Sequence, residues 1–171
     1  MHADDTRERS TSSATHDGFA VSLNLKTGYL FDAECDLASA EAIAIDEAPP
    51  LGSGNHFTPS RLLAAAVASC LGSSLLFCLR KARVTVRGLR VEVNGVTRRN
   101  EQGRLRVARM QVELHPDIVE ADLERVPRCL DIFQDFCVVT ESVRNGIDIA
   151  VEVVLPQSDT KLAAAGDSVA D

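Results

Sequence analysis

The run of residues from Thr58 to Ala82, TPSRLLAAAVASCLGSSLLFCLRKA, constrains the fold more than any other part of the sequence. Its middle carries no charged residue, and apolar side chains occur on every side of the helical wheel. Thr58 is a residue type that caps helices, and Pro59 suits a first helical turn because its missing N–H costs nothing there. The pattern predicts one long helix that protein surrounds on all sides, with Cys70 at its middle.

Length and composition predict one domain with a tail at each end. The chain has 171 residues, and 45% of them are apolar, which is enough for one sizeable core. We expect residues 1–17 to be a disordered N-terminal tail, residues 18–156 to form a single domain, and residues 157–171 to be a flexible C-terminal tail. The formal charge of −7 argues against a nucleic-acid partner, which needs a basic face.

The long apolar run raises the question of a membrane span. It contains Ser69, Gly72 and Ser73 as well as many alanines, so a buried helix in a protein without a membrane partner is the better interpretation. The N-terminal segment is charged and polar throughout, with no apolar signal region. We therefore expect a cytoplasmic, reducing location, where the five cysteines need not form structural disulfides.

Alternating apolar residues predict strands on both sides of the long helix. Before it, residues 19–34 form a hairpin pattern, and a third short strand is expected at 42–45. After it, 84–97 and 105–114 predict a second hairpin. Along the returning strand the residues expected to be buried change from odd-numbered to even-numbered positions. We therefore expect a bulge near Ala108-Arg109. His115-Pro116 is expected to end that strand.

The last third of the domain is helical by pattern. Residues 117–136 predict a helix that Pro127 divides into two pieces. A further turn begins at Cys137, Asn145-Gly146 is a stop signal, and 147–153 alternate as a final strand. The predicted order is βββ–α–ββ–α(α)–β, an α+β fold with mostly antiparallel pairing and a long buried central helix.

The five cysteines offer two candidates for chemistry. Two spacings of eight residues, 78 − 70 and 137 − 129, place thiols about 80° apart on a helix, which is poor zinc geometry. We expect no metal site, and no nucleotide-binding motif is present. Cys70 lies in the buried helix and Cys137 lies near a helix start, where a thiolate is favoured. Taken alone, each cysteine is more often a small core residue than a reactive group, and that is the interpretation given to Cys35, Cys78 and Cys129.

Two segments resemble the OsmC/Ohr family. Pro59 to Cys70 looks like the family's central-helix motif, a Pro followed by a Leu/Ala-rich helix and a Cys eleven residues on. The segment DFCVVT, residues 135–140, looks like its second Cys motif, and the element order fits from about Phe19 to Leu155. The resemblance implies an intertwined homodimer with active sites at the subunit interface, needing no cofactor.

The resemblance also implies roles for the two motif cysteines. The family's best-known activity is thiol-dependent reduction of organic hydroperoxides. On that model Cys70 is the peroxidatic thiolate and becomes a sulfenic acid, and Cys137 resolves it as a Cys70–Cys137 disulfide, within or between chains. An external dithiol reductant then restores the thiols by exchange, so hydroperoxide and dithiol are the expected partners.

The sequence departs from the Ohr branch at the activating charges. Ser60 stands where an acidic residue is expected, the hairpin at 19–34 contains no Arg, and Val138 replaces the common Pro. Two alternatives therefore remain open. The first is a non-catalytic OsmC-fold protein that binds a small apolar ligand, and the second is a thiol redox sensor.

Four residues are candidates to line a substrate pocket or to activate a thiol. Glu141 and Arg144 lie four and seven residues after Cys137, on the same face of a helical turn. Arg61 lies on the helix face opposite Cys70, so it could act only across a dimer interface. His56 lies in the Gly-rich loop before the helix. Each is also compatible with an ordinary solvated side chain.

Overall fold

The computed structural model describes residues 18–155 and 161–163. The chain divides into two compact units, residues 1–59 and 60–171, and each is described by itself. The predicted disordered tail at 1–17 and most of the predicted tail at 157–171 lie outside the described residues. The prediction of a single domain over 18–156 stays a prediction.

The first unit is a three-stranded antiparallel sheet. Its strands are β1 (Val21–Thr27), β2 (Leu30–Cys35) and β3 (Ile43–Ile45), in the order β1-β2-β3. The predicted hairpin and third strand are both confirmed. Beyond β3 the chain turns back, and the Asp46 N–H donates to the Phe57 carbonyl at 3.0 Å.

Asp46 organises the loop that follows β3. Its buried carboxylate accepts hydrogen bonds from the Ser53 hydroxyl at 2.6 Å and from the Ser53 and Glu47 N–H groups at 2.7 and 2.8 Å. The hydroxyl bond is the largest cause that lowers the pKa of Asp46, because it stabilises the charged form. The Pro/Gly-rich loop thus has a defined conformation.

Apolar residues alternate along β1, a pattern typical of a strand with one buried face, but in the single chain neither face of β1 is buried. Every residue of β1 is exposed, and the buried apolar residues of this unit are Ala33 and Ile45. A three-stranded sheet buries a face only where a second layer covers it. Within the described residues of this unit no helix supplies such a layer.

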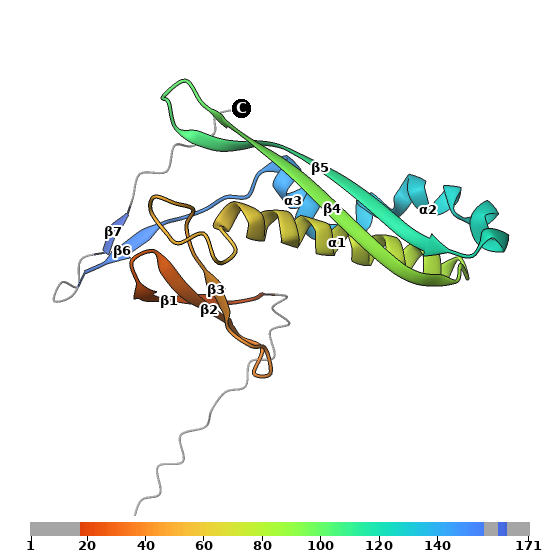
Figure 1. The fold of residues 1–171 in the computed structure, drawn as a ribbon, viewed down its shortest axis with the longest axis horizontal. Coiled ribbons are helices and arrows are strands. Elements are labelled where there is room, and N and C mark those ends of the chain that lie inside the picture. Colours follow the sequence, from red (N-terminus) through yellow and green to blue (C-terminus); the bar gives the residue numbers. More distant parts are fainter. Residues whose placement is uncertain (1–17, 156–160, 164–171) are drawn as a thin grey trace, which may run out of the picture. The chain divides into compact units, whose positions relative to one another are not determined.

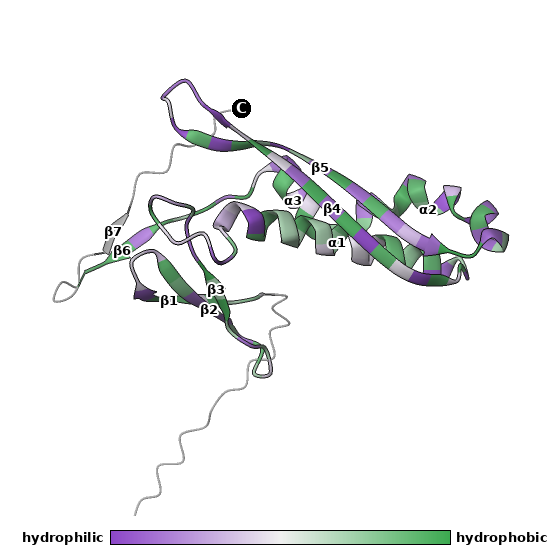
Figure 2. Cartoon of the chain, in the orientation of Figure 1, coloured by the Kyte–Doolittle hydropathy of each residue, from purple (hydrophilic) through white to green (hydrophobic). Residues whose placement is uncertain are grey.

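The second unit is built on α1 (Pro59–Lys81), which confirms the predicted helix to within a residue at each end. The hairpin of β4 (Val86–Arg99) and β5 (Leu105–Ile118) lies along it (Figure 1). The approach is close at Gly72, where an added Cβ would lie 3.3 Å from a methyl of Val91. Figure 2 shows hydrophobic and hydrophilic residues alternating along both strands, as a one-sided sheet requires.

The predicted bulge in the returning strand is confirmed. Val96 pairs with Arg109 and Thr97 pairs with Val107, so Ala108 is the extra residue. The predicted end of the strand at His115-Pro116 is wrong, because β5 continues to Ile118. Since β4 is the one partner strand of β5 among the described residues, alternate N–H groups of β5 point away from it, and a Pro at such a position removes no ladder hydrogen bond.

Four short helices follow the hairpin. They are the 3-10 helix η1 (Glu120–Arg125), α2 (Pro127–Ile132), the 3-10 helix η2 (Phe133–Phe136) and α3 (Val138–Asn145). The division at Pro127, the turn beginning at Cys137 and the stop at Gly146 (φ 78°) are confirmed. Helical structure starts at Glu120 instead of 117, because β5 extends further than predicted.

The last paired strands are shorter than predicted and include one that was not predicted. Strand β6 (Glu152–Val154) pairs with β7 (Lys161–Ala163), which lies within the predicted C-terminal tail. Residues 147–151 alternate like a strand, but within the described residues they have no partner strand. Alternation shows that a segment can form a strand, and pairing depends on a neighbour.

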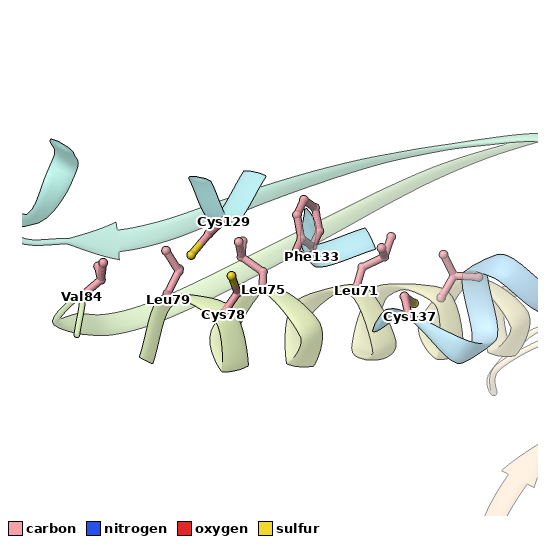
Figure 3. Packing of buried hydrophobic residues seen from close by; sticks show 9 residues of the cluster. Leu71, Leu75, Cys78, Leu79, Val84, Cys129, Phe133 and Cys137 are labelled. Atoms are coloured by element: carbon pink, nitrogen blue, oxygen red, sulfur yellow. The ribbon is translucent and has the colours of Figure 1, made fainter. Parts of the chain in front are cut away.

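The core of the second unit lies between α1, the β4–β5 hairpin and the short helices. Figure 3 shows its packed side chains. The buried cluster consists of Val67, Leu71, Leu75, Cys78, Leu79, Val84, Cys129, Phe133 and Cys137. On the opposite face of α1, Phe77 is 60% exposed within the part of the chain that the structure describes. The expectation that protein surrounds this helix on all sides is therefore not met by one chain.

By length and composition α1 could cross a membrane, with a mean hydropathy of 2.2. One face of it, however, is packed into the buried cluster just described. A core helix passes the same hydropathy test, and this packing identifies α1 as one.

Candidate functional site

The structure brings Cys70 and Cys137 together within one chain. Cys70 lies in the middle of α1 and is partly buried, whereas Cys137 immediately precedes α3 and is 0% exposed. The Cys70 thiol donates a hydrogen bond to the Cys137 sulfur. The Cys137 thiol in turn donates to the Thr140 hydroxyl oxygen, with a sulfur–oxygen distance of 2.9 Å. The two sulfurs thus belong to one hydrogen-bonded chain.

Two opposing influences act on Cys70. Burial raises the pKa of its thiol, and so does the hydrogen bond with Cys137, because both favour the protonated form. The backbone N–H groups of Val139 and Thr140 lower that pKa by donating to the sulfur. Burial is the largest cause, so the resting group is a thiol with thiolate-stabilising donors already in place.

The position of these donors follows from how α3 begins. Cys137 is the N-cap residue in extended conformation (φ −88°, ψ 93°), and its carbonyl accepts the first helical bond from the Glu141 N–H. Its side chain does not cap the helix. The first N–H groups of a helix have no partner inside the helix, so those of Val139 and Thr140 are available to Cys70.

A cavity of about 490 Å³ lies next to this pair in the second unit. Thr140 lines it, although neither Cys70 nor Cys137 does. One face of α1 contributes Leu63, Val67 and Leu71. The remaining lining residues are Val107, Ala108, Arg109, Met110, Val112, Leu114, Phe133, Gln134, Val143 and Arg144. The cavity is mainly apolar with a small number of polar groups, as small-molecule sites usually are.

Two of the candidate residues lie at this cavity or beside it. Arg144 lines it, donating to the Gln134 side chain at 2.9 Å and to the Glu141 carboxylate at 2.6 Å. Glu141 is thereby placed to orient Arg144, although it does not line the cavity itself. The helical spacing that suggested both residues also explains their pairing, since residues three apart are neighbours on a helix surface.

The other two candidates lie elsewhere. Arg61 is exposed and lines a separate cavity of about 450 Å³ together with Ser60 and residues of the hairpin. His56 is exposed in the loop of the first unit.

Sequence reasoning missed Arg109, the second cation that lines the 490 Å³ cavity. It follows the bulged residue Ala108, and a bulge changes the direction of the side chains beside it. The parity change in the strand was therefore the available signal, although it was interpreted only as a feature of the fold.

One cluster in the described residues has the donor types of a metal site. His115 lies on the exposed hairpin with its Nε2 atom 3.6 Å from carboxylate oxygens of both Glu92 and Glu113. The same Glu92 also pairs with Arg90, which satisfies part of its charge. Surface ion pairs of this kind are common and weak, and this cluster is distant in sequence from both motif cysteines.

The family comparison agrees with this fold and with both motifs. The family model described as OsmC-like protein matches residues 52–152, more than half of the chain and a range that includes Cys70 and Cys137. The chain belongs to the OsmC-like family. A search of curated proteins finds no match.

Solved structures with the same fold are distant in sequence. An OsmC-like protein of unknown function from Vibrio cholerae has 16% identity and a TM-score of 0.64, covering 73% of this chain and 92% of its own. A putative osmotic stress induced and detoxification response protein from Psychrobacter arcticus has 21% identity and a TM-score of 0.59, covering 75% and 91%. An organic hydroperoxide resistance protein from Elizabethkingia anophelis has 18% identity and a TM-score of 0.56, covering 77% and 91%.

Proposed function

We propose that this protein is a thiol-dependent peroxidase that reduces organic hydroperoxides, with Cys70 as the peroxidatic and Cys137 as the resolving residue. The observation that carries the proposal is the direct interaction of the two thiols beside the N–H groups of Val139 and Thr140. Packing alone would be satisfied by Ala or Val at both positions. The similarity to a protein named for organic hydroperoxide resistance supports the same substrate class.

In the first step the Cys70 thiolate attacks the hydroperoxide oxygen. The O–O bond breaks, the departing alkoxide takes up the proton that the Cys70 thiol lost and leaves as an alcohol, and Cys70 becomes a sulfenic acid. The N–H groups of Val139 and Thr140 stabilise the thiolate before attack. The cavity that Thr140 lines is mainly apolar, which suits the organic part of the substrate. Arg109 and Arg144 add two cations to the cavity wall.

In the second step Cys137 attacks the sulfenic sulfur. A disulfide forms and water leaves, so two thiols and one hydroperoxide yield one disulfide, one alcohol and one water. The Thr140 hydroxyl holds the Cys137 thiol at 2.9 Å, which keeps its sulfur near Cys70. An external dithiol then reduces the disulfide by exchange through a mixed disulfide.

The proposed enzyme acts as an intertwined homodimer in the cytoplasm. Support for the dimer comes from the apolar surface that a single chain leaves exposed, on α1 at Phe77 and on β1 at Leu23 and Leu25. Leu23 and Leu25 lie on one face of β1, and a second chain packed against such exposed apolar side chains would remove them from water. A second copy would also provide the covering that the sequence pattern of α1 requires.

The test is consumption of cumene hydroperoxide in the presence of a dithiol. Cys70→Ser should lower the rate by more than about 100-fold, because a hydroxyl is a far weaker nucleophile than a thiolate. Cys35→Ser is the matched control, since Cys35 lies exposed in β2 of the other unit, and it should keep the wild-type rate.

The resolving role has its own readout in the same assay. Cys137→Ser treated with one equivalent of hydroperoxide should accumulate a sulfenic acid on Cys70 that a dimedone probe labels. No consumption by the wild type, or the same rate in Cys70→Ser, would reject the proposal. Saturable binding of the hydroperoxide without turnover would instead support the ligand-binding alternative.

A further inference from the structure

A second pair of thiols lies in the same core as the first. Cys78 belongs to the last turns of α1 and is 9% exposed, and Cys129 belongs to α2 and is 1% exposed. Figure 3 shows their sulfur atoms pointing toward one another between the two helices. They interact by a side-chain hydrogen bond, so no other side chain separates them.

This second pair has its own cavity. A space of about 330 Å³ is lined by both thiol residues, by two cations and by two apolar residues: Cys78, Lys81, Ala82, Arg128, Cys129 and Ile132. A cavity of this size admits a small reagent, and the positive charge of Arg128 favours ionisation of Cys129 against the larger effect of burial, which raises its pKa. In contrast to the first pair, both cysteines line their cavity directly.

The local backbone holds the second pair in place. The Asp122 carboxylate accepts the Thr85 N–H at 2.7 Å and pairs with Arg125 at 3.0 Å, and Arg125 also donates to the Arg83 carbonyl at 3.1 Å. These bonds tie the segment before α2 to the chain that follows α1. Cys129 is therefore presented to Cys78 by a fixed framework.

We propose that Cys78 and Cys129 form a second redox site, in which a small hydroperoxide oxidises the two thiols to a disulfide that links α1 to α2. The Cys78 sulfur gives up its proton and attacks the peroxide oxygen, the O–O bond breaks, and the departing alkoxide (or hydroxide) takes up that proton and leaves as an alcohol (or water). Cys129 then attacks the Cys78 sulfenic sulfur and releases water. Cys78 takes the first role because it is the more exposed of the two.

The site is independent of Cys70 and Cys137. Eight residues of helix separate Cys70 from Cys78 by about 12 Å, which is too far for direct exchange between the pairs. The inference goes beyond the proposed peroxidase function and does not depend on turnover at Cys70. Loss of the first pair should leave the second able to oxidise.

The test uses a Cys35→Ser/Cys70→Ser/Cys137→Ser variant, in which Cys78 and Cys129 are the remaining cysteines. Hydrogen peroxide should lower the free thiols of the folded protein from two to none per chain. Trypsin should then yield the peptides 62–80 and 129–144 joined by a disulfide, because no Lys or Arg interrupts either. Adding Cys78→Ala to this variant should abolish the link.

A second measurement covers the case in which the triple variant does not fold. In the wild-type protein, chymotrypsin can cut at Phe77 and Phe133, between the two cysteines of each segment, so the oxidised pairs can be assigned directly. A Cys78–Cys129 link in the folded protein supports the proposal. Thiols that remain free, oxidise to sulfonic acids without linking, or link only in urea would overturn it.

Discussion

The two thiol pairs of this protein are similar in geometry and different in surroundings. Both pairs join α1 to the segment from α2 to α3. Their order along the two segments is reversed, because the earlier Cys70 meets the later Cys137 and the later Cys78 meets the earlier Cys129. The spacing is eight residues on each side, 78 − 70 and 137 − 129. Two antiparallel segments with equal spacing bring both pairs into contact at once.

The groups around each pair differ. Cys70 receives two backbone N–H groups from the start of α3, which lower its pKa against the effect of burial. For Cys129 no backbone N–H group of the described residues lowers the pKa; burial, together with the hydrogen bond that its thiol makes with Cys78, raises the pKa to about 11, opposed by the charge of Arg128. The comparison shows that burial alone does not set the chemistry of a thiol; the donors and charges next to it do.

The largest expected effect comes from removing the side chain that packs between the pairs. Leu75 lies between Cys70 and Cys78 on α1 and is 2% exposed. Leu75→Ala should lower the free energy of unfolding by about 3 kcal/mol, because it deletes buried methyl groups and leaves a cavity. Urea unfolding measures this, with Arg80→Ala, exposed on the same helix, as a control that should change stability by less than about 0.5 kcal/mol. Equal effects of the two variants would contradict the described core.

Titration of the thiols tests the electrostatic difference between the pairs. Both Cys70 and Cys129 have raised pKa values, so each becomes reactive toward iodoacetamide only as pH rises, by about tenfold per pH unit below its pKa. The alkylation rate of Cys70 should level off at a lower pH than that of Cys129, which should keep rising to about pH 11. Mass spectrometry of chymotryptic peptides separates the sites, and exposed Cys35 serves as reference. Identical pH profiles for Cys70 and Cys129 would remove the distinction.

A smaller effect is expected from Thr140→Val, which preserves shape and removes the hydroxyl that accepts the Cys137 thiol. Loss of this buried hydrogen bond should cost about 1 kcal/mol and slow Cys70–Cys137 disulfide formation by roughly fivefold. The Cys78–Cys129 pair should oxidise at its original rate. Thr97→Val, at an exposed position of β4, is the matched control. Equal slowing of both pairs would show that Thr140 supports the core and does not position Cys137.

Local sequence patterns were sufficient for most elements of the fold. The helix at 59–81, both hairpins, the bulge at Ala108 and the break at Pro127 follow from periodicity, turn residues and Pro chemistry, which act over a few residues. The strand end at Pro116 could not be predicted, because a Pro is tolerated or excluded according to whether its N–H side faces a partner strand.

The candidate site was predicted in part. Cys70 and Cys137 were found through motifs, whereas Arg109 required knowing which way a bulge turns its side chain. Cys78 and Cys129 were interpreted as ordinary core residues. The two eight-residue spacings are visible in the sequence. They were used to judge the geometry of the thiols within each segment, and the two segments were not matched with each other.

The sequence by itself determined the long apolar helix, the order of the strands and the family's two cysteine motifs, because each depends on residues close together in the chain. Only the tertiary structure decided which thiols meet, which N–H groups reach Cys70, and which cations line each cavity. These contacts join residues tens of positions apart, and they depend on the direction in which packed segments run past one another. The long helix carries one thiol of each pair, and the partner segment opposite it decides what each thiol can do.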